Sequence, residues 1–215
     1  MLESPALTNG SYSRLRVSLL AVGLLLLLWS GVGAREEGTW ALEGFPIVLA
    51  VPVLIATRRR FPLTPLAYWL IFLHALILML GGHYTYEHVP LGNWVRDGLH
   101  LARNPYDRLG HLAQGFVPAI IAREILLRAS LLRRGGWLFF IVTCICLAIS
   151  ASYELVEWGV AVAIGQGANA FLGTQGDPWD TQWDMLCALV GAMVAQVILA
   201  RVHDRQLRAM EQCGG

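Results

Sequence analysis

The chain has 215 residues, of which 56% are hydrophobic and only 14% are charged, and its mean hydropathy is +0.54. A soluble domain carries about 25% charged residues, so this composition excludes an ordinary soluble protein. The net charge of +1, with no basic patch, gives no indication of a nucleic-acid partner. The long apolar runs predict an all-α, polytopic transmembrane helix bundle that forms a single membrane domain over residues 1–215 and is embedded in the lipid bilayer.

Six segments are predicted to cross the membrane, since a span requires about 20 mostly apolar residues. They lie at residues 15–34, 40–57, 62–82, 106–128, 136–164 and 180–202. The second is short because it starts behind Glu43. The first has two interpretations: a retained helix, or a cleavable signal peptide with Arg14 and Arg16 before the apolar run and small residues near Ala34.

Arginines gather at alternate ends of consecutive predicted spans. They are Arg14, Arg16, Arg58, Arg59, Arg60, Arg123, Arg128, Arg133, Arg134, Arg201, Arg205 and Arg208. Because cytoplasmic loops carry an excess of Lys and Arg, the pattern predicts that these residues and both the N- and C-termini are cytoplasmic. The connections at 83–105 and 165–179 then face the opposite side of the membrane.

One polar phrase occurs twice, as NPYDRLGH at 104–111 and as DPWDTQWD at 177–184. In each, a capping residue precedes a proline, an aromatic residue and an aspartate, and a second polar residue follows four places after that aspartate. Asn104 and Asp177 are suited to cap a helix whose first position is the proline. The two phrases therefore predict two helix starts. Each begins the second helix of a helix–loop–helix unit, and the two units run in the same direction.

The aspartates of the repeated phrase have two interpretations. Asp107 and Asp180 complement the positive end of the helix dipole, so capping alone explains them. His111 and Asp184 lie four residues further on, on the same helix faces but too deep to cap. Charged groups at membrane depth usually face a cavity or one another and mark function, so these deeper residues predict a site.

Other acids and imidazoles lie in the same half of the bundle. Glu154 and Glu157 share a face of the fifth predicted span, and His83 and Glu87 close the third. Carboxylates gathered in a low dielectric need a cation, which an arginine, a proton or a metal could supply. Facing helices that carry such pairs form metal sites in bundle cores.

We therefore predict a divalent-metal site with candidate ligands His83, Glu87, Asp107, His111, Glu154, Asp180 and Asp184. Such a ligand set suits Zn, Mn, Fe or Mg, and the sequence does not choose among them. Glu154 and Glu157 are the candidate catalytic carboxylates, with a general-base role. Gln114 is interpreted as orienting a ligand, His74 as a hydrogen-bonded packing residue, and Glu124, among arginines, as part of a surface ion pair.

Three blocks together, YDRLGHLAQGFVPA, SASYELVEWGVA and FLGTQGDPWDTQWDMLCALVGA, resemble the signature blocks of the YjdF-like bacterial inner-membrane family. The resemblance covers about residues 60–202. It implies a small multi-pass protein of the bacterial inner membrane, and it implies no reaction.

Three functions remain open on these observations. A periplasm-facing cluster with a bound ion fits a hydrolase or transferase acting on lipid or lipid-linked headgroups. Inward-facing acids and histidines also describe a proton-coupled transporter, although the cytoplasmic halves of the last three spans lack matching acids apart from Glu124. The third is a non-catalytic scaffold or sensor whose polar network only fastens the helices.

Overall fold

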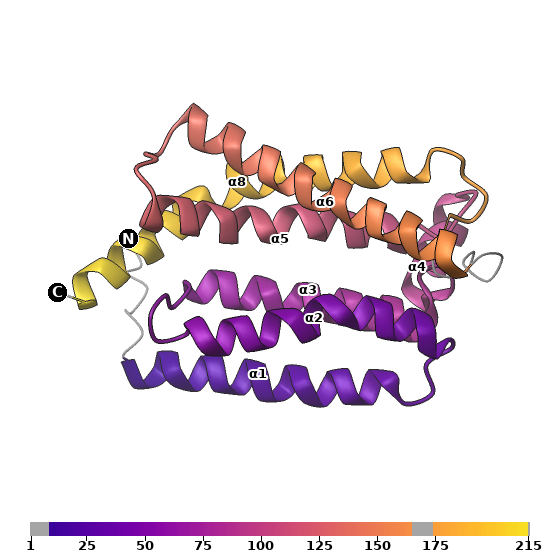
Figure 1. Cartoon of the computed structure of the whole chain (residues 1–215), viewed down its shortest axis with the longest axis horizontal. Helices are drawn as coiled ribbons and strands as arrows, with labels where there is room; N and C mark the ends of the chain where they lie inside the picture. The colour runs from indigo at the N-terminus through magenta and orange to yellow at the C-terminus, as the bar shows by residue number, and fades with distance from the viewer. Residues whose placement is uncertain (1–8, 165–173, 215) are drawn as a thin grey trace.

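A computed structural model describes residues 9–164 and 174–214, and this part of the chain is all-α, as predicted (Figure 1). Its elements in chain order are α1 (Asn9–Gly31), α2 (Glu37–Thr57), α3 (Pro65–Tyr84), the 3-10 helix η1 (Tyr86–His88), α4 (Pro90–Leu99), α5 (Tyr106–Ala129), α6 (Gly136–Ile164) and α8 (Asp180–Gly214).

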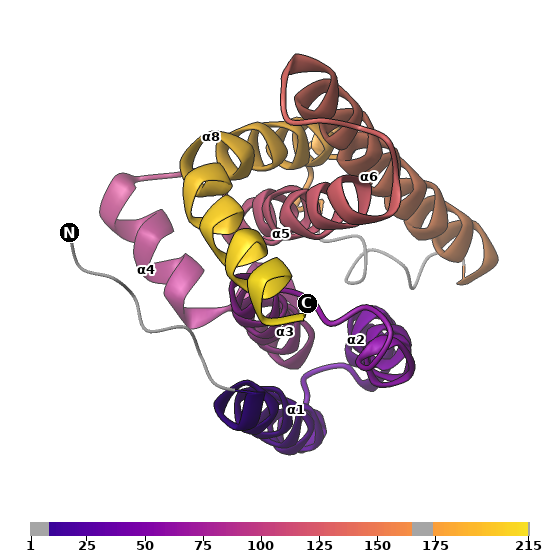
Figure 2. The same ribbon diagram turned by 90° about the vertical axis from the view of Figure 1, so that its left-hand side faces the viewer.

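Five of the described helices are long and apolar enough to cross a membrane, namely α1, α2, α3, α6 and α8. Helix α5 is of similar length but carries charged residues, among them Asp107, Arg108, Arg123 and Glu124. It packs against α3, α6 and α8, which surround it when the bundle is viewed along its length (Figure 2). Because its neighbours shield it from lipid, α5 can carry polar side chains that a peripheral helix could not.

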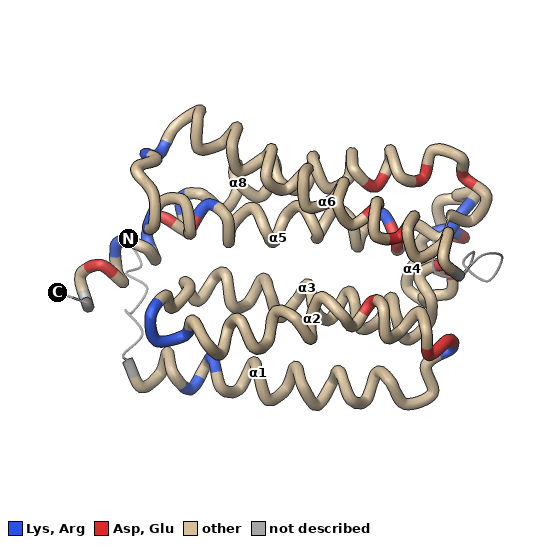
Figure 3. The backbone as a smooth tube through the Cα atoms, viewed as in Figure 1, with Lys and Arg blue, Asp and Glu red and all other residues tan. Residues whose placement is uncertain are grey.

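The bundle has two chemically different ends (Figure 3). Acidic residues concentrate where α5 and α8 begin, and we call this the acidic end. The opposite end carries the arginines of residues 58–60 and those that follow α5, and we call it the arginine end. Helix α1 begins and α8 ends at the arginine end, so the first and last described helices have their outer ends on the same side of the bundle (Figure 1).

Helices α5 and α8 cross at very close range because glycines stand at their contact. A Cβ atom added to Gly115 would lie 1.8 Å from the carbonyl oxygen of Ala188, and one added to Gly191 would lie 2.1 Å from that of Leu112. Small residues at such a contact let two membrane helices approach backbone to backbone. The close crossing brings the first turns of α5 and α8 side by side.

A buried polar network joins α3, α5 and α8 toward the arginine end. Glu124 is fully buried, so its assignment to a surface ion pair was wrong. Its carboxylate accepts hydrogen bonds from the backbone N and Oγ1 of Thr64, from Arg128 Nη1 and from His203 Nε2. Arg123 Nη1 donates to His203 Nδ1 at 2.9 Å. We call these five residues the Glu124 network; they fasten the start of α3 to α5 and α8.

Candidate metal centre

The two copies of the repeated phrase both form local turns that start a helix. Asn104 Oδ1 accepts a hydrogen bond from the backbone N of Tyr106 at 3.0 Å, and Asp177 Oδ1 accepts one from that of Trp179 at 2.9 Å. Helix α5 therefore begins at Tyr106 and α8 at Asp180, slightly later than the predicted starts at the prolines. Both starts place the polar residues of the phrase at the acidic end.

Asp107, His111 and Asp184 converge between α5 and α8. His111 Nε2 lies 3.6 Å from Asp107 Oδ1 and 3.9 Å from Asp184 Oδ2. One ligand atom from each residue lies within 4.8 Å of the others, and all three side chains are buried. Ligands held about 2 Å from one divalent ion lie about 3 to 4 Å apart, so a small inward movement would complete three coordination bonds. We call these residues the Asp–His–Asp triad.

Gln114 contacts the imidazole of the triad from one turn below. Its Oε1 lies 3.0 Å from His111 Nδ1. An amide oxygen only accepts hydrogen bonds, so Nδ1 carries the proton and donates it to Gln114. Nε2 is then the nitrogen that faces the two aspartates, which is the arrangement of a histidine prepared for metal ligation by a hydrogen-bonded neighbour.

Two carboxylate oxygens beside the triad have no hydrogen-bond partner among the described residues. They are Oε1 of Glu154 and Oδ1 of Asp184, and both atoms are buried. Glu154 Oε1 lies 3.7 Å from His111 Nδ1, and Asp184 Oδ1 lies 3.5 Å from Arg108 Nε. Buried polar atoms are nearly always satisfied in folded proteins, so these two oxygens are acceptors that a cation could fill.

Two arginines neutralise the outer aspartates. Arg103 donates to Asp107 Oδ2 at 3.1 Å and also to Asp180. Arg108 Nη2 donates to Asp177 Oδ2 and to Asp180 Oδ1, each at 3.0 Å. Asp180, a predicted metal ligand, therefore contacts two guanidinium groups and lies outside the triad. Asp107 differs, because its other oxygen, Oδ1, remains directed at His111.

The two predicted catalytic carboxylates lie beside the triad on α6. Glu154 is buried and Glu157 is partly buried. The charged groups near Glu157 include Glu154 and His111. Glu154 and Glu157, three residues apart, thus share the face of α6 that is turned toward α5. The site combines acids from α5, α6 and α8.

Helix α2 contributes one more acid, Glu43, that sequence reasoning missed as a site residue. Glu43 is 3% exposed, and its Oε2 accepts hydrogen bonds from the hydroxyls of Tyr86 at 2.9 Å and Tyr153 at 3.4 Å. Burial raises the pKa of Tyr86 well above its ordinary value, so this hydroxyl stays protonated and donates. The charged groups near Glu43 include Asp107, His111 and Glu157. Its position inside an apolar span was the available signal.

Two predicted ligands lie elsewhere in the bundle. His83 Nδ1 is 2.7 Å from the carbonyl oxygen of Ser30, and its ring stacks on Trp29. Glu87 lies in η1, where its Oε1 is 3.2 Å from His88 Nδ1. The structure therefore does not bring these two side chains to the triad, and in the part of the chain that it describes only the triad has the spacing of a three-ligand site.

Comparisons with known proteins address location and family. Residues 15–205 match the family described as "Predicted membrane protein (DUF2238)". The chain is similar to "Inner membrane protein YjdF" of Escherichia coli (strain K12), with 57% identity over 184 residues that cover 86% of this chain and 88% of that protein. No solved structure matches. The family match includes every residue of the triad.

Proposed function

The chain belongs to the DUF2238 family of predicted membrane proteins, and from that premise we propose that it is a metal-dependent hydrolase or transferase acting on lipid or lipid-linked headgroups. The family resemblance and the inner-membrane location predicted from the sequence are confirmed. Neither the family description nor the name of the relative states a reaction, so the proposed chemistry depends on the geometry of the acidic end.

The proposed topology has six spans, because α5 packs among α3, α6 and α8, three of the five helices that are themselves long and apolar enough to cross the membrane. The arginine end is assigned to the cytoplasm by the excess of positive charge at that end (Figure 3). The start of α1 and the end of α8 then both lie on the cytoplasmic side. The acidic end, with the triad one turn below it, faces the periplasm.

The observation that carries the proposal is the convergence of three buried side chains, Asp107, His111 and Asp184, that each offer one ligand atom. Asp107 Oδ1, His111 Nε2 and Asp184 Oδ2 would hold the ion, and Gln114 would keep the imidazole in the required tautomer. A divalent ion bound there would act as a Lewis acid toward water or a phosphoryl or carbonyl oxygen. Zn, Mn, Fe and Mg all accept ligands of these types.

Side chains around the triad have the chemistry that headgroup cleavage or transfer requires. Glu154, with its free Oε1, is placed to take a proton from a nucleophile on the inner side of the site. Arg103 and Arg108 lie on the outer side, where a guanidinium group can contact a phosphate. A site just below the outer surface of the membrane is accessible to a lipid headgroup, which favours this substrate class.

Metal content tests the proposal directly. The full chain, purified in detergent, is loaded in turn with Zn²⁺, Mn²⁺, Fe²⁺ and Mg²⁺, desalted and analysed for bound metal. We expect about one equivalent of one ion in the native chain and in Asp177→Asn, and none in Asp184→Asn, because Asp184 belongs to the triad and Asp177 does not. A well-folded native chain that retains none of these ions would contradict the metal site.

Activity needs a second experiment, because metal binding alone does not make an enzyme. Glu154→Gln preserves the size of the side chain and lies outside the triad, so we expect it to retain metal. The loaded native chain should release headgroups or phosphate from a panel of lipid-linked substrates, and Glu154→Gln should lose that activity by at least about 100-fold. Equal activity in the two proteins would remove Glu154 from the mechanism.

One observation favours a scaffold as the second candidate function. Arg103 and Arg108 form ion pairs with four aspartates at and near the starts of α5 and α8, which alone would fasten these helices. Buried ion pairs can fix helix packing without any ligand. In that case Asp184→Asn and Asp177→Asn would both fold without metal, as would the native chain.

A further inference from the structure

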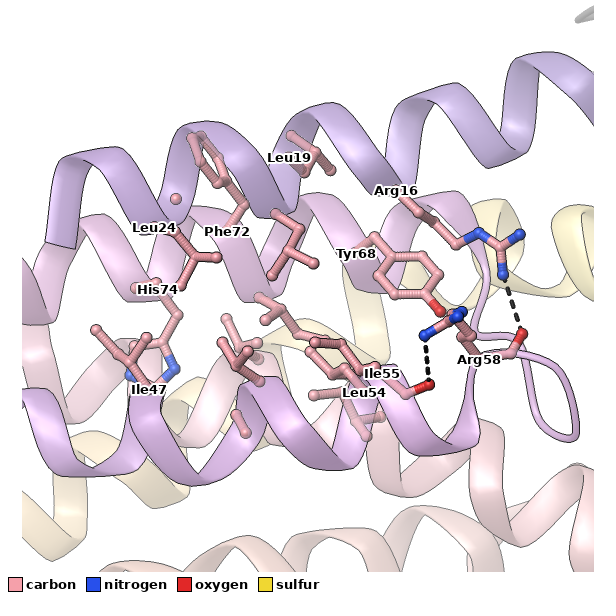
Figure 4. A pocket seen from close by; sticks show the side chains of 18 of the residues that line it. Arg16, Leu19, Leu24, Ile47, Leu54, Ile55, Arg58, Tyr68, Phe72 and His74 are labelled. Atoms are coloured by element: carbon pink, nitrogen blue, oxygen red, sulfur yellow. Dashed lines mark hydrogen bonds between the residues drawn. The ribbon is translucent and has the colours of Figure 1, made fainter. Parts of the chain in front are cut away.

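An apolar groove separate from the metal centre runs between α1, α2 and α3, with α5 as its floor (Figure 4). Its volume is about 660 Å³, within the range of about 300 to 1,000 Å³ that is usual for ligand sites. Aliphatic and aromatic side chains form its walls, among them Leu19, Leu54, Ile71, Phe72 and Val117. No residue of the triad lines it.

Three arginines line the end of the groove that lies at the arginine end of the bundle. They are Arg16 of α1 and Arg58 and Arg59, which follow the last turn of α2. Arg16 Nη1 donates to the carbonyl oxygen of Arg58 at 3.0 Å, and Arg58 Nη1 donates to that of Ile55 at 3.1 Å (Figure 4). Within the described ranges, none of the three arginines forms an ion pair with a carboxylate.

One donor at this mouth of the groove is unfilled. Arg16 Nε is buried and has no hydrogen-bond partner in the described part of the chain. A buried charged donor without an acceptor is costly, so the position requires an oxygen that the protein itself does not supply. The guanidinium of Arg16 also lies over the ring of Tyr12, 4.6 Å from its centroid. Because Arg16, Arg58 and Arg59 have no carboxylate partner in the described part of the chain, their charges favour an oxygen that belongs to an anion.

The length of the groove matches one leaflet of a bilayer. Its lining on α3 extends from Tyr68 to Met79, a helical rise of about 17 Å. Half of a hydrocarbon core of about 30 Å is about 15 Å. His74 lies midway along this wall, and its Nε2 makes no hydrogen bond with described residues, which the prediction of a hydrogen-bonded packing role did not anticipate. The remainder of the deep groove is apolar.

We propose that this groove binds one anionic phospholipid, with an acyl chain between α1, α2 and α3 and its phosphate at Arg16. Basic pockets between membrane helices on the cytoplasmic side are recognised sites for anionic lipid headgroups. An acyl chain fills the apolar length, and the phosphate supplies the oxygen that Arg16 Nε lacks. A helix from a second copy of the chain would fill the apolar part but would bring no anion to this end.

Native mass spectrometry of the delipidated full chain tests headgroup recognition. Added phosphatidylglycerol should bind with at least about tenfold higher affinity than phosphatidylcholine, because only the former has a net negative charge for the arginines. Arg16→Gln should lower phosphatidylglycerol affinity by about tenfold. Arg14→Gln is the matched control: it removes the same charge from the same helix but does not line the groove, and it should change affinity less than twofold.

A second pair of variants tests the groove itself and does not depend on the arginines. Ala50 lines the groove, whereas Ala56 lies on the same helix, is exposed and does not line it. Ala50→Phe should fill the groove and displace the lipid, and Ala56→Phe should leave it bound. Unchanged lipid binding in Ala50→Phe, equal affinity for the two lipids, or a dimer that Ala50→Phe dissociates would each overturn the proposal. Metal content should be unaffected throughout, so failure here leaves the metal proposal intact.

Discussion

The Asp–His–Asp triad and the Glu124 network are built from the same residue types but are completed differently. Each joins α5 to α8 through an imidazole and buried carboxylate groups, two in the triad and one in the Glu124 network, with arginines nearby. In the Glu124 network both nitrogens of His203 and both oxygens of Glu124 contact protein groups within 3.1 Å. In the triad His111 Nε2 lies 3.6 and 3.9 Å from its nearest carboxylates, beyond hydrogen-bonding distance.

We propose that this difference separates a network that fastens helices from a site that binds a ligand. Arg123 can only donate, so His203 Nδ1 accepts and Nε2 carries the proton that it donates to Glu124. The Glu124 network therefore has no acceptor left for a ligand. At the triad, Gln114 fixes the opposite tautomer and leaves Nε2 directed at Asp107 Oδ1 and Asp184 Oδ2, without a hydrogen bond to either. Buried acids and histidines therefore indicate a ligand site only where protein partners leave some of their atoms unfilled.

The largest expected effect is the loss of Glu124. Glu124→Ala removes the acceptor shared by Thr64, Arg128 and His203 and leaves buried donors unpaired, so we expect the free energy of unfolding to fall by about 3 to 5 kcal/mol. Denaturation in detergent micelles, followed by circular dichroism, measures it. Glu211→Ala, at an exposed position of α8, should change it by less than about 0.5 kcal/mol.

The same variant also separates the two regions chemically. The fraction of Glu124→Ala that remains folded should bind metal like the native chain, since no triad atom has been changed. A variant with native stability but without metal would reverse the roles assigned to the two regions.

The next effect concerns the close crossing that assembles the triad. Gly115→Val would place side-chain atoms against the backbone of Ala188, so α5 and α8 must separate. We expect about 1 to 3 kcal/mol of destabilisation and a metal affinity lowered by at least about tenfold, because the ligand atoms come from both helices. Gly159→Val on α6 is the matched control, since a Cβ there meets no atom within 4 Å. Native metal affinity in Gly115→Val would show that the crossing does not position the ligands.

Gln114 gives a smaller effect on the site alone. Gln114→Leu removes the acceptor for His111 Nδ1 but changes none of the three proposed ligand residues. Metal affinity should therefore fall by about 10- to 100-fold with little loss of stability. Titration with the ion identified by metal analysis measures the change. Gln114→Glu restores an oxygen at the same place and should recover most of the affinity, whereas a purely structural role would make both variants equivalent.

Hydropathy predicted the helical fold well, because long apolar runs have few alternatives in a bilayer. It did so even for α5, whose polar residues are covered by three other helices. The i,i+4 spacing of the repeated phrase identified Asp107 with His111 and Asp180 with Asp184, because spacing fixes which side chains share a helix face. Spacing could not show that arginines would bind Asp180, since that contact joins residues far apart in the chain.

The residues that sequence reasoning misplaced all depend on such distant contacts. Glu43 has no acidic neighbour at helical spacing, and only the packing of α2 brings it to Tyr86 and Tyr153. Glu124 stands among arginines in the sequence, yet α3 and α8 cover it completely. The sequence neighbours of a residue thus indicated which charges could pair with it. They did not indicate its burial, because burial depends on helices that meet only in the folded bundle.

The smallest effect is expected at Glu87, which marks the boundary of the site. Glu87 and His88 form a partly exposed pair, whose contribution solvent screening limits to less than about 1 kcal/mol. Glu87→Gln should therefore leave metal affinity within about twofold of the native value, in contrast to Asp184→Asn. A tenfold or larger loss would require η1 to move its carboxylate toward the triad when metal binds. The acidic end would then differ further from the Glu124 network, because a conformational change would complete its ligand set, whereas the contacts of the Glu124 network are already complete.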